Sequence, residues 1–349
     1  MKIIIRTILY ALLTLVLYLG LIFGLFFKGM NWDFYFESTE EMVDEIGEIP
    51  SNTSFALKEV SSLKLWIMKS SSVFFKKFQK LNDANIYNMM YQSDGNLVSG
   101  ILMTPKTPGP HPCVIYNRGG NRDFGRIGFK QISNVLDDLV SNGYVVIASN
   151  YRGNNGGQGA DEFGGADVAD VTHLISILEE LEIADASKVG MYGVSRGGMM
   201  TYEVLKNQGK IQVAVVKSGS TDLFKDLTHP DTSDFEKYIY GQMIPDYYTN
   251  IEASLSARSA VKWPDQMKRV PLLMLHGSGD KRVVYEEAFD LANLLDEIQY
   301  PYQLVTYTDD DHLLSKHKRE SKARTLEWFD RYLKEGKEFE VEDSRVTVD

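Results

Sequence analysis

The sequence predicts an α/β fold in which a mainly parallel sheet carries helices on both faces. Short apolar runs of strand length alternate with longer amphipathic segments from Cys113 to Glu335. The runs are apolar almost throughout, as in strands buried on both faces. One of them, Val189 to Tyr192, leads directly into Gly-x-Ser-x-Gly and then a helical pattern at Met199 to Leu205. Strand, sharp turn and helix therefore follow one another around Ser195.

The predicted sheet begins with a hairpin. Residues 86–91 and 97–103 are apolar runs, and Asp94-Gly95 between them is a preferred pair for a tight turn. A proline-rich loop follows at 105–112. We then expect strands at 113–116, 144–148, 189–192, 213–217, 272–276 and 302–307, and helices at 130–142, 167–181, 199–205, 286–297 and 316–335.

Composition limits the function classes. The 349 residues carry a formal net charge of −11, so the chain is not expected to bind nucleic acid, whose phosphates an acidic surface repels. Cys113 is the single cysteine, which excludes an intramolecular disulfide and a cysteine-based zinc site. It lies in an apolar run, and we expect it to be a buried core residue.

The N-terminal segment predicts a membrane anchor at residues 1–30. Residues 7–27 contain no charged side chain, and about 20 apolar residues cross a bilayer. Lys2 and Arg6 precede the run, which favours a cytoplasmic N-terminus and an extracytoplasmic catalytic domain on a single-pass protein. A cleavable signal peptide is the alternative, although no small-residue cleavage site closes the apolar run.

The rest of the chain divides into three parts. Residues 31–84 are expected to be a membrane-proximal, partly helical extension, and residues 85–336 the main domain. Residues 223–267 form an insertion rich in tyrosine and acidic residues, whose aromatic side chains either line a substrate cleft or pack internally. The remainder, 337–349, is expected to be a charged tail.

Ser195 is the candidate nucleophile. A serine hydroxyl reacts only when a base accepts its proton, and a third group must hold that base in the right tautomer. Asp280 follows the predicted strand at 272–276, and His312 follows the strand at 302–307. The chain order serine, acid, histidine, each after a strand, is that of the hydrolases that use this turn. Asp222 is an alternative acid and His317 an alternative base, whereas His276 is expected to shape its loop.

Acyl transfer also needs donors for the developing oxyanion. The backbone N–H of Arg196, directly after the nucleophile, is one candidate. The loop after the 113–116 strand supplies the other, with Arg118, Gly119 and Gly120. The Arg118 side chain would either contact an acidic substrate group or pair with a local carboxylate.

These motifs resemble the α/β-hydrolase domain of the prolyl oligopeptidase family and of similar acyl-peptidases and esterases. The resemblance implies Ser195 as nucleophile, Asp280 as orienting acid and His312 as base, with no metal or organic cofactor. The matching residues are Ser93-Asp94-Gly95 with Gly100, Tyr116-Asn117-Arg118-Gly119-Gly120, Asn150-Tyr151-Arg152-Gly153 with Gly156-Gly157, Gly165 with Asp167 and Asp170, Gly193 to Gly198, His276-Gly277-Ser278-Gly279-Asp280 with Val283, and Asp311-His312.

The chain departs from that family in two ways. Arg118 stands where the family's oxyanion loop usually has histidine or tyrosine, and only about eighty residues precede the hydrolase domain, too few for the propeller of family peptidases. We therefore expect a membrane-anchored serine hydrolase that cleaves an ester, amide or peptide bond in a small molecule or short peptide. The alternatives are a catalytically silent membrane-tethered binding protein and an acyltransferase on the same fold.

Overall fold

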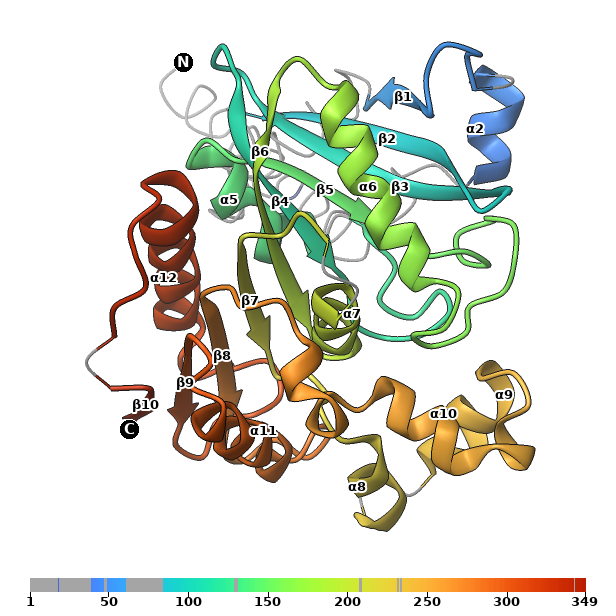
Figure 1. The fold of residues 1–349 in the computed structure, drawn as a ribbon. Coiled ribbons are helices and arrows are strands. Elements are labelled where there is room, and N and C mark those ends of the chain that lie inside the picture. Colours follow the sequence, from blue (N-terminus) through green and yellow to red (C-terminus); the bar gives the residue numbers. More distant parts are fainter. Residues whose placement is uncertain are drawn as a thin grey trace, which may run out of the picture.

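The computed structural model has a ten-stranded mixed sheet with helices on both faces (Figure 1). It describes Tyr18 and residues 39–46, 49–60, 84–128, 131–206, 209–230, 232, 234–341 and 343–349. The strand order is β1-β2-β3-β5-β4-β6-β7-β8-β9-β10. The strands are β1 Phe55–Glu59, β2 Ala84–Ser93, β3 Asn96–Pro105, β4 His111–Asn117, β5 Val145–Ser149, β6 Ala184–Val194, β7 Val213–Lys217, β8 Leu272–Gly277, β9 Tyr302–Tyr307 and β10 Arg345–Val348.

The antiparallel and parallel parts of the sheet lie side by side. Strands β1, β2 and β3 pair antiparallel with their neighbours, and β3 is antiparallel to β5. From β5 to β10 every pair is parallel. Asp94 and Gly95 join β2 to β3 with φ of 48° and 77°, as a type I′ turn requires. The predicted hairpin and the mainly parallel sheet are therefore confirmed.

Two apolar clusters cover the two faces of the sheet. One contains side chains of α6 (Val168–Glu180), α7 (Arg196–Lys206) and α11 (Tyr285–Glu297). The other contains side chains of η3 (Ile132–Leu136), α5 (Asp137–Ser141), α12 (Lys318–Phe329) and η8 (Asp330–Lys334). Because the central strands are buried on both faces, they are apolar at nearly every position. This pattern is the reason that the sequence predicted them as strands.

The insertion is helical and projects beyond the edge of the sheet where the parallel strands end (Figure 1). Tyr240, Tyr247 and Trp263 are buried in its core, whereas Tyr238 and Tyr248 are exposed. Packing thus accounts for Tyr240, Tyr247 and Trp263, whereas Tyr238 and Tyr248 remain candidates for lining a substrate cleft. Its elements are α8 Leu223–Thr228, η4 Glu236–Tyr240, α9 Gly241–Met243, η5 Tyr247–Thr249, α10 Ile251–Arg258, η6 Ala260–Lys262 and η7 Pro264–Gln266.

The structure corrects the sequence at both edges of the sheet. The expected charged tail contains β10, which pairs parallel with β9, and Val346 and Val348 pack against the core. In the region expected to be a partly helical extension, α2 (Thr39–Ile46) is a helix, but β1 adds an antiparallel edge strand to β2. Both edge strands are short and carry charged residues, so their composition hid them.

The predicted anchor cannot be compared with the structure. Apart from Tyr18, residues 7–27 lie outside the described residues, as do 61–83 of the expected extension. Within the described parts of the chain, no helix combines the length and the apolar character that crossing a membrane requires.

Candidate active site

Ser195 occupies a strained turn between β6 and α7. Its φ is 58°, in the left-handed region that a non-glycine residue rarely adopts. The backbone around it is too crowded for side chains: a Cβ on Gly193 would lie 2.2 Å from Gly197 O, and one on Gly197 would lie 1.9 Å from Asn117 O. The Ser195 N–H donates to Lys217 O at 2.9 Å, which ties the turn to β7. The predicted strand–turn–helix around Ser195 is present, and it leaves the side chain partly exposed.

Asp280 and His312 form a buried pair at the carboxyl ends of β8 and β9. His312 Nδ1 donates to Asp280 Oδ2 at 2.7 Å, and Asp280 Oδ1 accepts the N–H groups of Arg282 and Val283. Burial raises the pKa of Asp280, but hydrogen bonds from His276 and His312 outweigh it and hold that pKa well below its usual range. The carboxylate therefore remains ionised and holds His312 so that the other ring nitrogen, Nε2, makes no hydrogen bond to any described residue.

The serine and the histidine lie at the same edge of the sheet without a direct bond. Strand β7 and then β8 separate β6 from β9, so the loops that carry Ser195, Asp280 and His312 leave neighbouring strands in one direction. Within the described residues, Ser195 Oγ makes no hydrogen bond, to His312 or to another group. Such contacts are often loose before a substrate is bound. The assignment of the three residues as a triad therefore remains a prediction.

The alternative acid and base have other contacts. His317 Nδ1 lies 2.9 Å from Asp310 Oδ2, and its ring stacks on Tyr307. The Asp222 side chain accepts the N–H of Phe224 and caps α8. His276 is buried, with its Nε2 2.9 Å from Val283 O and 3.3 Å from Asp280 Oδ2.

The loop after β4 lies against Ser195, as expected. A Cβ on Gly119 would be 3.0 Å from Ser195 Cβ and 3.7 Å from Ser195 Oγ, so only glycine allows this approach without a shift. Gly120 has a φ of 79°, which also favours glycine. The Arg196 N–H is at the first position of α7, where the helix itself offers no acceptor. Gly119 and Arg196 thus bring backbone close to Ser195 Oγ from two sides.

The Arg118 side chain has neither of the expected roles. It is fully buried, and its guanidinium donates to carbonyl oxygens instead of a carboxylate or the substrate side. Nε and Nη2 donate to Asn150 O, and Nη2 also donates to Arg122 O at 2.8 Å. Nη1 donates to Gly119 O and Phe124 O. Arg118 therefore holds loop 119–124 from the inside.

The Arg196 side chain connects the same loop to the segment before α6. Its guanidinium contacts Asp161 at 2.5 Å and Asp167 at 2.6 Å, and Nη1 donates to Gly120 O. The sequence had suggested only a backbone role for Arg196. Asp161 was missed because an acidic residue in a glycine-rich loop carries no local signal, and its importance follows from a contact across 35 positions in the chain.

Buried carboxyl groups anchor the insertion beside the site. Glu287 of α11 accepts bonds from Ser220 Oγ and from the N–H groups of Thr221 and Asp222. Tyr240 donates to the buried Asp226. Burial is the main cause that raises the pKa of both Glu287 and Asp226. The charge of Asp226 raises the pKa of Glu287 further, and the charge of Asp222 raises that of Asp226.

The described residues contain no cluster of histidine, cysteine or carboxylate side chains that could hold a metal ion.

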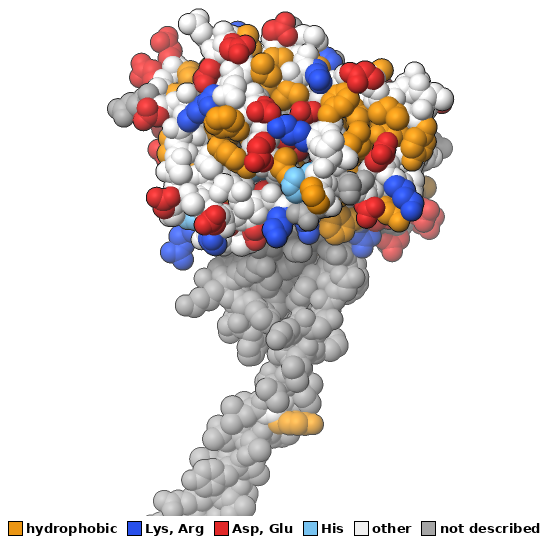
Figure 2. Space-filling view, turned by 90° about the horizontal axis from the view of Figure 1, so that it is seen from below, with side chains coloured by type: hydrophobic (Ala, Val, Ile, Leu, Met, Phe, Trp, Pro, Cys, Tyr) orange, Lys and Arg blue, Asp and Glu red, His pale blue; other side chains and the backbone are white. Residues whose placement is uncertain are grey.

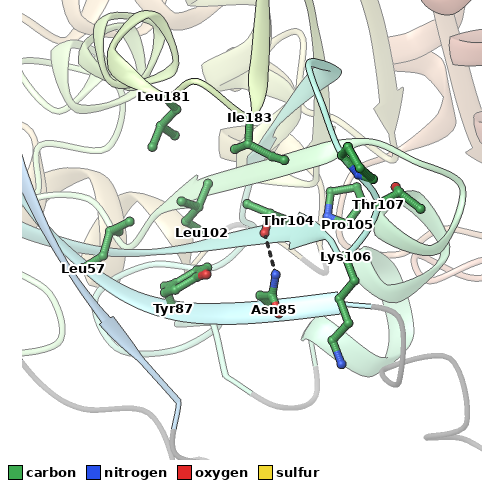
Figure 3. Close-up of a pocket in the computed structure, with 11 residues that line it drawn as sticks. Leu57, Asn85, Tyr87, Leu102, Thr104, Pro105, Lys106, Thr107, Leu181 and Ile183 are labelled. Atoms are coloured by element: carbon green, nitrogen blue, oxygen red, sulfur yellow. Dashed lines mark hydrogen bonds between the residues drawn. The ribbon is translucent and has the colours of Figure 1, made fainter.

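A groove of about 360 Å³ lies away from Ser195, where β2 begins and β3 ends (Figure 3). Its lining is mostly apolar or uncharged, and Asn85 Nδ2 donates to Thr104 Oγ1 across it at 3.3 Å. It offers no nucleophile–base pair, so the chemistry of the site is that of Ser195 and its neighbours.

Comparisons with known proteins agree with this geometry. The model of the prolyl oligopeptidase family matches residues 130–336. An uncharacterized peptidase YtmA of Bacillus subtilis is 26% identical over 70% of this chain and 92% of the relative. The acylamino-acid-releasing enzyme of Sus scrofa is 28% identical over 52% of this chain, but this match covers only 26% of that enzyme.

Solved structures show the same fold. An acylaminoacyl peptidase of Pyrococcus horikoshii superposes with a TM-score of 0.66 at 19% identity, over 78% of this chain and 45% of the other. A puromycin-hydrolyzing peptidase of Mycobacterium tuberculosis gives a TM-score of 0.60 at 20% identity, over 75% and 41%. The chain thus spans less than half of these longer proteins.

Replacing Arg118 with methionine should loosen loop 119–124. The substitution keeps the length of the side chain but leaves buried carbonyl groups without their donor, which costs about 1–3 kcal/mol for each group. We expect kcat on a chromogenic ester to fall roughly 10- to 100-fold, somewhat less than the loss of one oxyanion donor causes. Arg126→Met, on a partly exposed arginine of the same segment, is the control and should keep kcat. Full activity of folded Arg118→Met would contradict the role of Arg118.

The buried carboxyl groups predict that the protein is more stable in mild acid. Where the folded pKa exceeds the unfolded one, the folded state binds more protons, so the free energy of unfolding falls as pH rises through that window. Since burial raises the pKa of Asp226 to about 7, we expect the wild type to lose stability from about pH 4 to pH 7, by at most about 1.4 kcal/mol per pH unit for each group. Asp226→Asn should flatten this slope in urea titrations, whereas Asp290→Asn, at a largely exposed site, should not. Identical slopes in Asp226→Asn and wild type would refute the assignment.

Proposed function

Because this chain belongs to the prolyl oligopeptidase family and is a serine hydrolase, we propose that it cleaves peptide or amide bonds with Ser195 as its nucleophile. His312 accepts the serine proton through Nε2 and later donates it to the leaving amine. Asp280 holds the ring and stabilises the imidazolium that forms in between. Water, activated by the same histidine, then releases the acyl group.

The observation that most supports this proposal is the buried Asp280–His312 pair at 2.7 Å, at the same sheet edge as a serine with left-handed backbone. An ionised aspartate holds its histidine partner in the tautomer whose Nε2 can accept a proton. The N–H groups of Arg196 and Gly119 are the proposed donors to the oxyanion. Preorganised donors of this kind usually make the largest single contribution to acyl transfer.

Short peptides are the proposed substrates. The relatives described above are peptidases by name, including acylamino-acid-releasing enzymes, and the same serine chemistry also cleaves esters. The insertion lies beside the site and presents Tyr238 and Tyr248 to the solvent. We propose that it limits substrate size. Figure 2, viewed from the side where the parallel strands end, shows acidic, basic and hydrophobic side chains intermixed around a histidine.

A fluorophosphonate probe tests the triad. This reagent phosphonylates only an activated serine, so the wild type should be labelled and Ser195→Ala should not. His312→Ala should reduce the labelling rate by 10³-fold or more, because the base is lost. Asp280→Asn should also be slow, through the wrong histidine tautomer. His317→Ala is the matched control. Equal labelling of wild type and His312→Ala would exclude His312 as the base.

We also propose that residues 7–27 anchor the enzyme in a membrane as a single span, with the catalytic domain outside the cytoplasm. The absence of charged side chains over this segment supports the proposal. The full chain should stay in the membrane fraction after washing with alkaline carbonate, and a variant that lacks residues 1–30 should be released. Recovery of the full chain in the wash would contradict the proposal. So would resistance of the catalytic domain to a protease added to the outside of intact cells.

A further inference from the structure

Loop 119–124 lies beside Ser195 and is held by several hydrogen bonds, and its residue Arg122 is exposed to solvent. The carbonyl groups of Gly119, Arg122 and Phe124 all accept bonds from the buried Arg118. The Arg122 N–H donates to Asp161 Oδ2 at 3.2 Å, and Asp161 is itself held by Arg196. Arg122 has a φ of 49°. Its backbone is thus held at both its N–H and its carbonyl, in a conformation that the chain does not adopt freely.

The side chain of Arg122 is exposed and reaches across to the insertion. Its Nη2 donates to Gln242 Oε1 of α9 at 2.7 Å. Within the described residues Arg122 makes no ion pair, in a chain whose net charge is −11. Its positive charge therefore meets only a neutral amide oxygen. The remaining guanidinium N–H groups are free to bind another acceptor.

The neighbouring acidic groups are turned to other partners. Asp161 is paired with Arg196, and Asp123 accepts the N–H of Asn155 with its Oδ1 at 2.7 Å. Neither carboxylate neutralises Arg122. Arg122 follows Gly120 by two residues, and consecutive Cα atoms are about 3.8 Å apart, so its backbone lies within about 8 Å of the oxyanion loop's glycine.

We propose that Arg122 is a specificity-determining residue that binds a carboxylate of the peptide substrate, and that Gln242 is its resting partner in the free enzyme. A guanidinium matches a carboxylate with two parallel hydrogen bonds, which a carboxamide cannot offer. The acidic-substrate contact that the sequence suggested for Arg118 belongs instead to the arginine four positions later. The substrate class is a short peptide with an acidic residue or a free carboxyl group near the cleaved bond. The proposal rests on the proposed function, because it requires Ser195 to be the nucleophile.

Paired fluorogenic peptides test this inference. In each pair, one peptide carries Glu and the other carries Gln at the same position. The position is varied over the two residues before and the two residues after the cleaved bond. In a further pair, one peptide ends in a carboxylate and the other in a carboxamide. We expect wild type to favour the carboxylate about tenfold in kcat/KM at one position, as a hydrogen bond between charged groups allows. In Arg122→Gln this ratio should fall to about one. Arg122→Lys should give an intermediate ratio, because lysine keeps the positive charge but cannot donate two parallel hydrogen bonds. Added salt should also reduce the wild-type ratio, since the charge is exposed.

The control is Arg269→Gln, which removes the same charge before β8, at the opposite end of the strands, where Arg269 donates to Ile298 O. It should keep the wild-type ratio. A wild type without carboxylate preference at any position would overturn the inference, as would an unchanged ratio in Arg122→Gln. Loss of all hydrolysis in folded Arg122→Gln would overturn it too, because Arg122 would then maintain the loop without selecting substrates. Failure of the proposed function has a different signature, since fluorophosphonate labelling of Ser195 would then be absent from wild type itself.

Discussion

The geometry around Ser195 depends on the buried guanidinium of Arg196, the next residue in the chain. Its side chain bonds to Asp161, Asp167 and Gly120 O. It therefore joins the turn at Ser195, the loop before α6 and loop 119–124. Removing one partner from such a buried pair typically costs about 3–5 kcal/mol, because the charge left behind is unpaired. Such a penalty opposes any independent movement of the three segments.

A second buried guanidinium supports the first. Arg118 and Arg196 both lie over the ring of Tyr151, at 4.8 Å and 4.9 Å from its centroid. Burial, followed by the charge of Arg196, lowers the pKa of Arg118 to about 10. The aromatic ring and the surrounding carbonyl oxygens offset the repulsion between the two cations. The Tyr151 hydroxyl also donates to Arg118 O, so the ring itself is held in place.

These internal contacts divide the arginines of the site by function. Arg118 and Arg196 are buried and shape the backbone, whereas Arg122 is exposed on the same loop. Two buried guanidinium groups are not accessible to a substrate, so we expect substrate selectivity to depend on exposed groups at the rim. The insertion lies next to that rim. Glu287 of α11 binds the loop after β7 from which the insertion starts, and the buried Asp226 accepts a bond from Tyr240 within the insertion.

The sequence alone predicted the parallel sheet, the hairpin at Asp94-Gly95, and the positions of Ser195, Asp280 and His312 after their strands. These features depend on local patterns: apolar runs, glycines at tight turns and the order of motifs. It missed β1 and β10, because short edge strands with charged residues gain their stability from the neighbour they pair with. Nor did it predict which arginine points inward. Arg118, Arg122 and Arg196 are chemically alike in the sequence, and only contacts with residues distant in the chain, such as Asn150, Gln242 and Asp161, decide which of their charges are buried and which face the solvent.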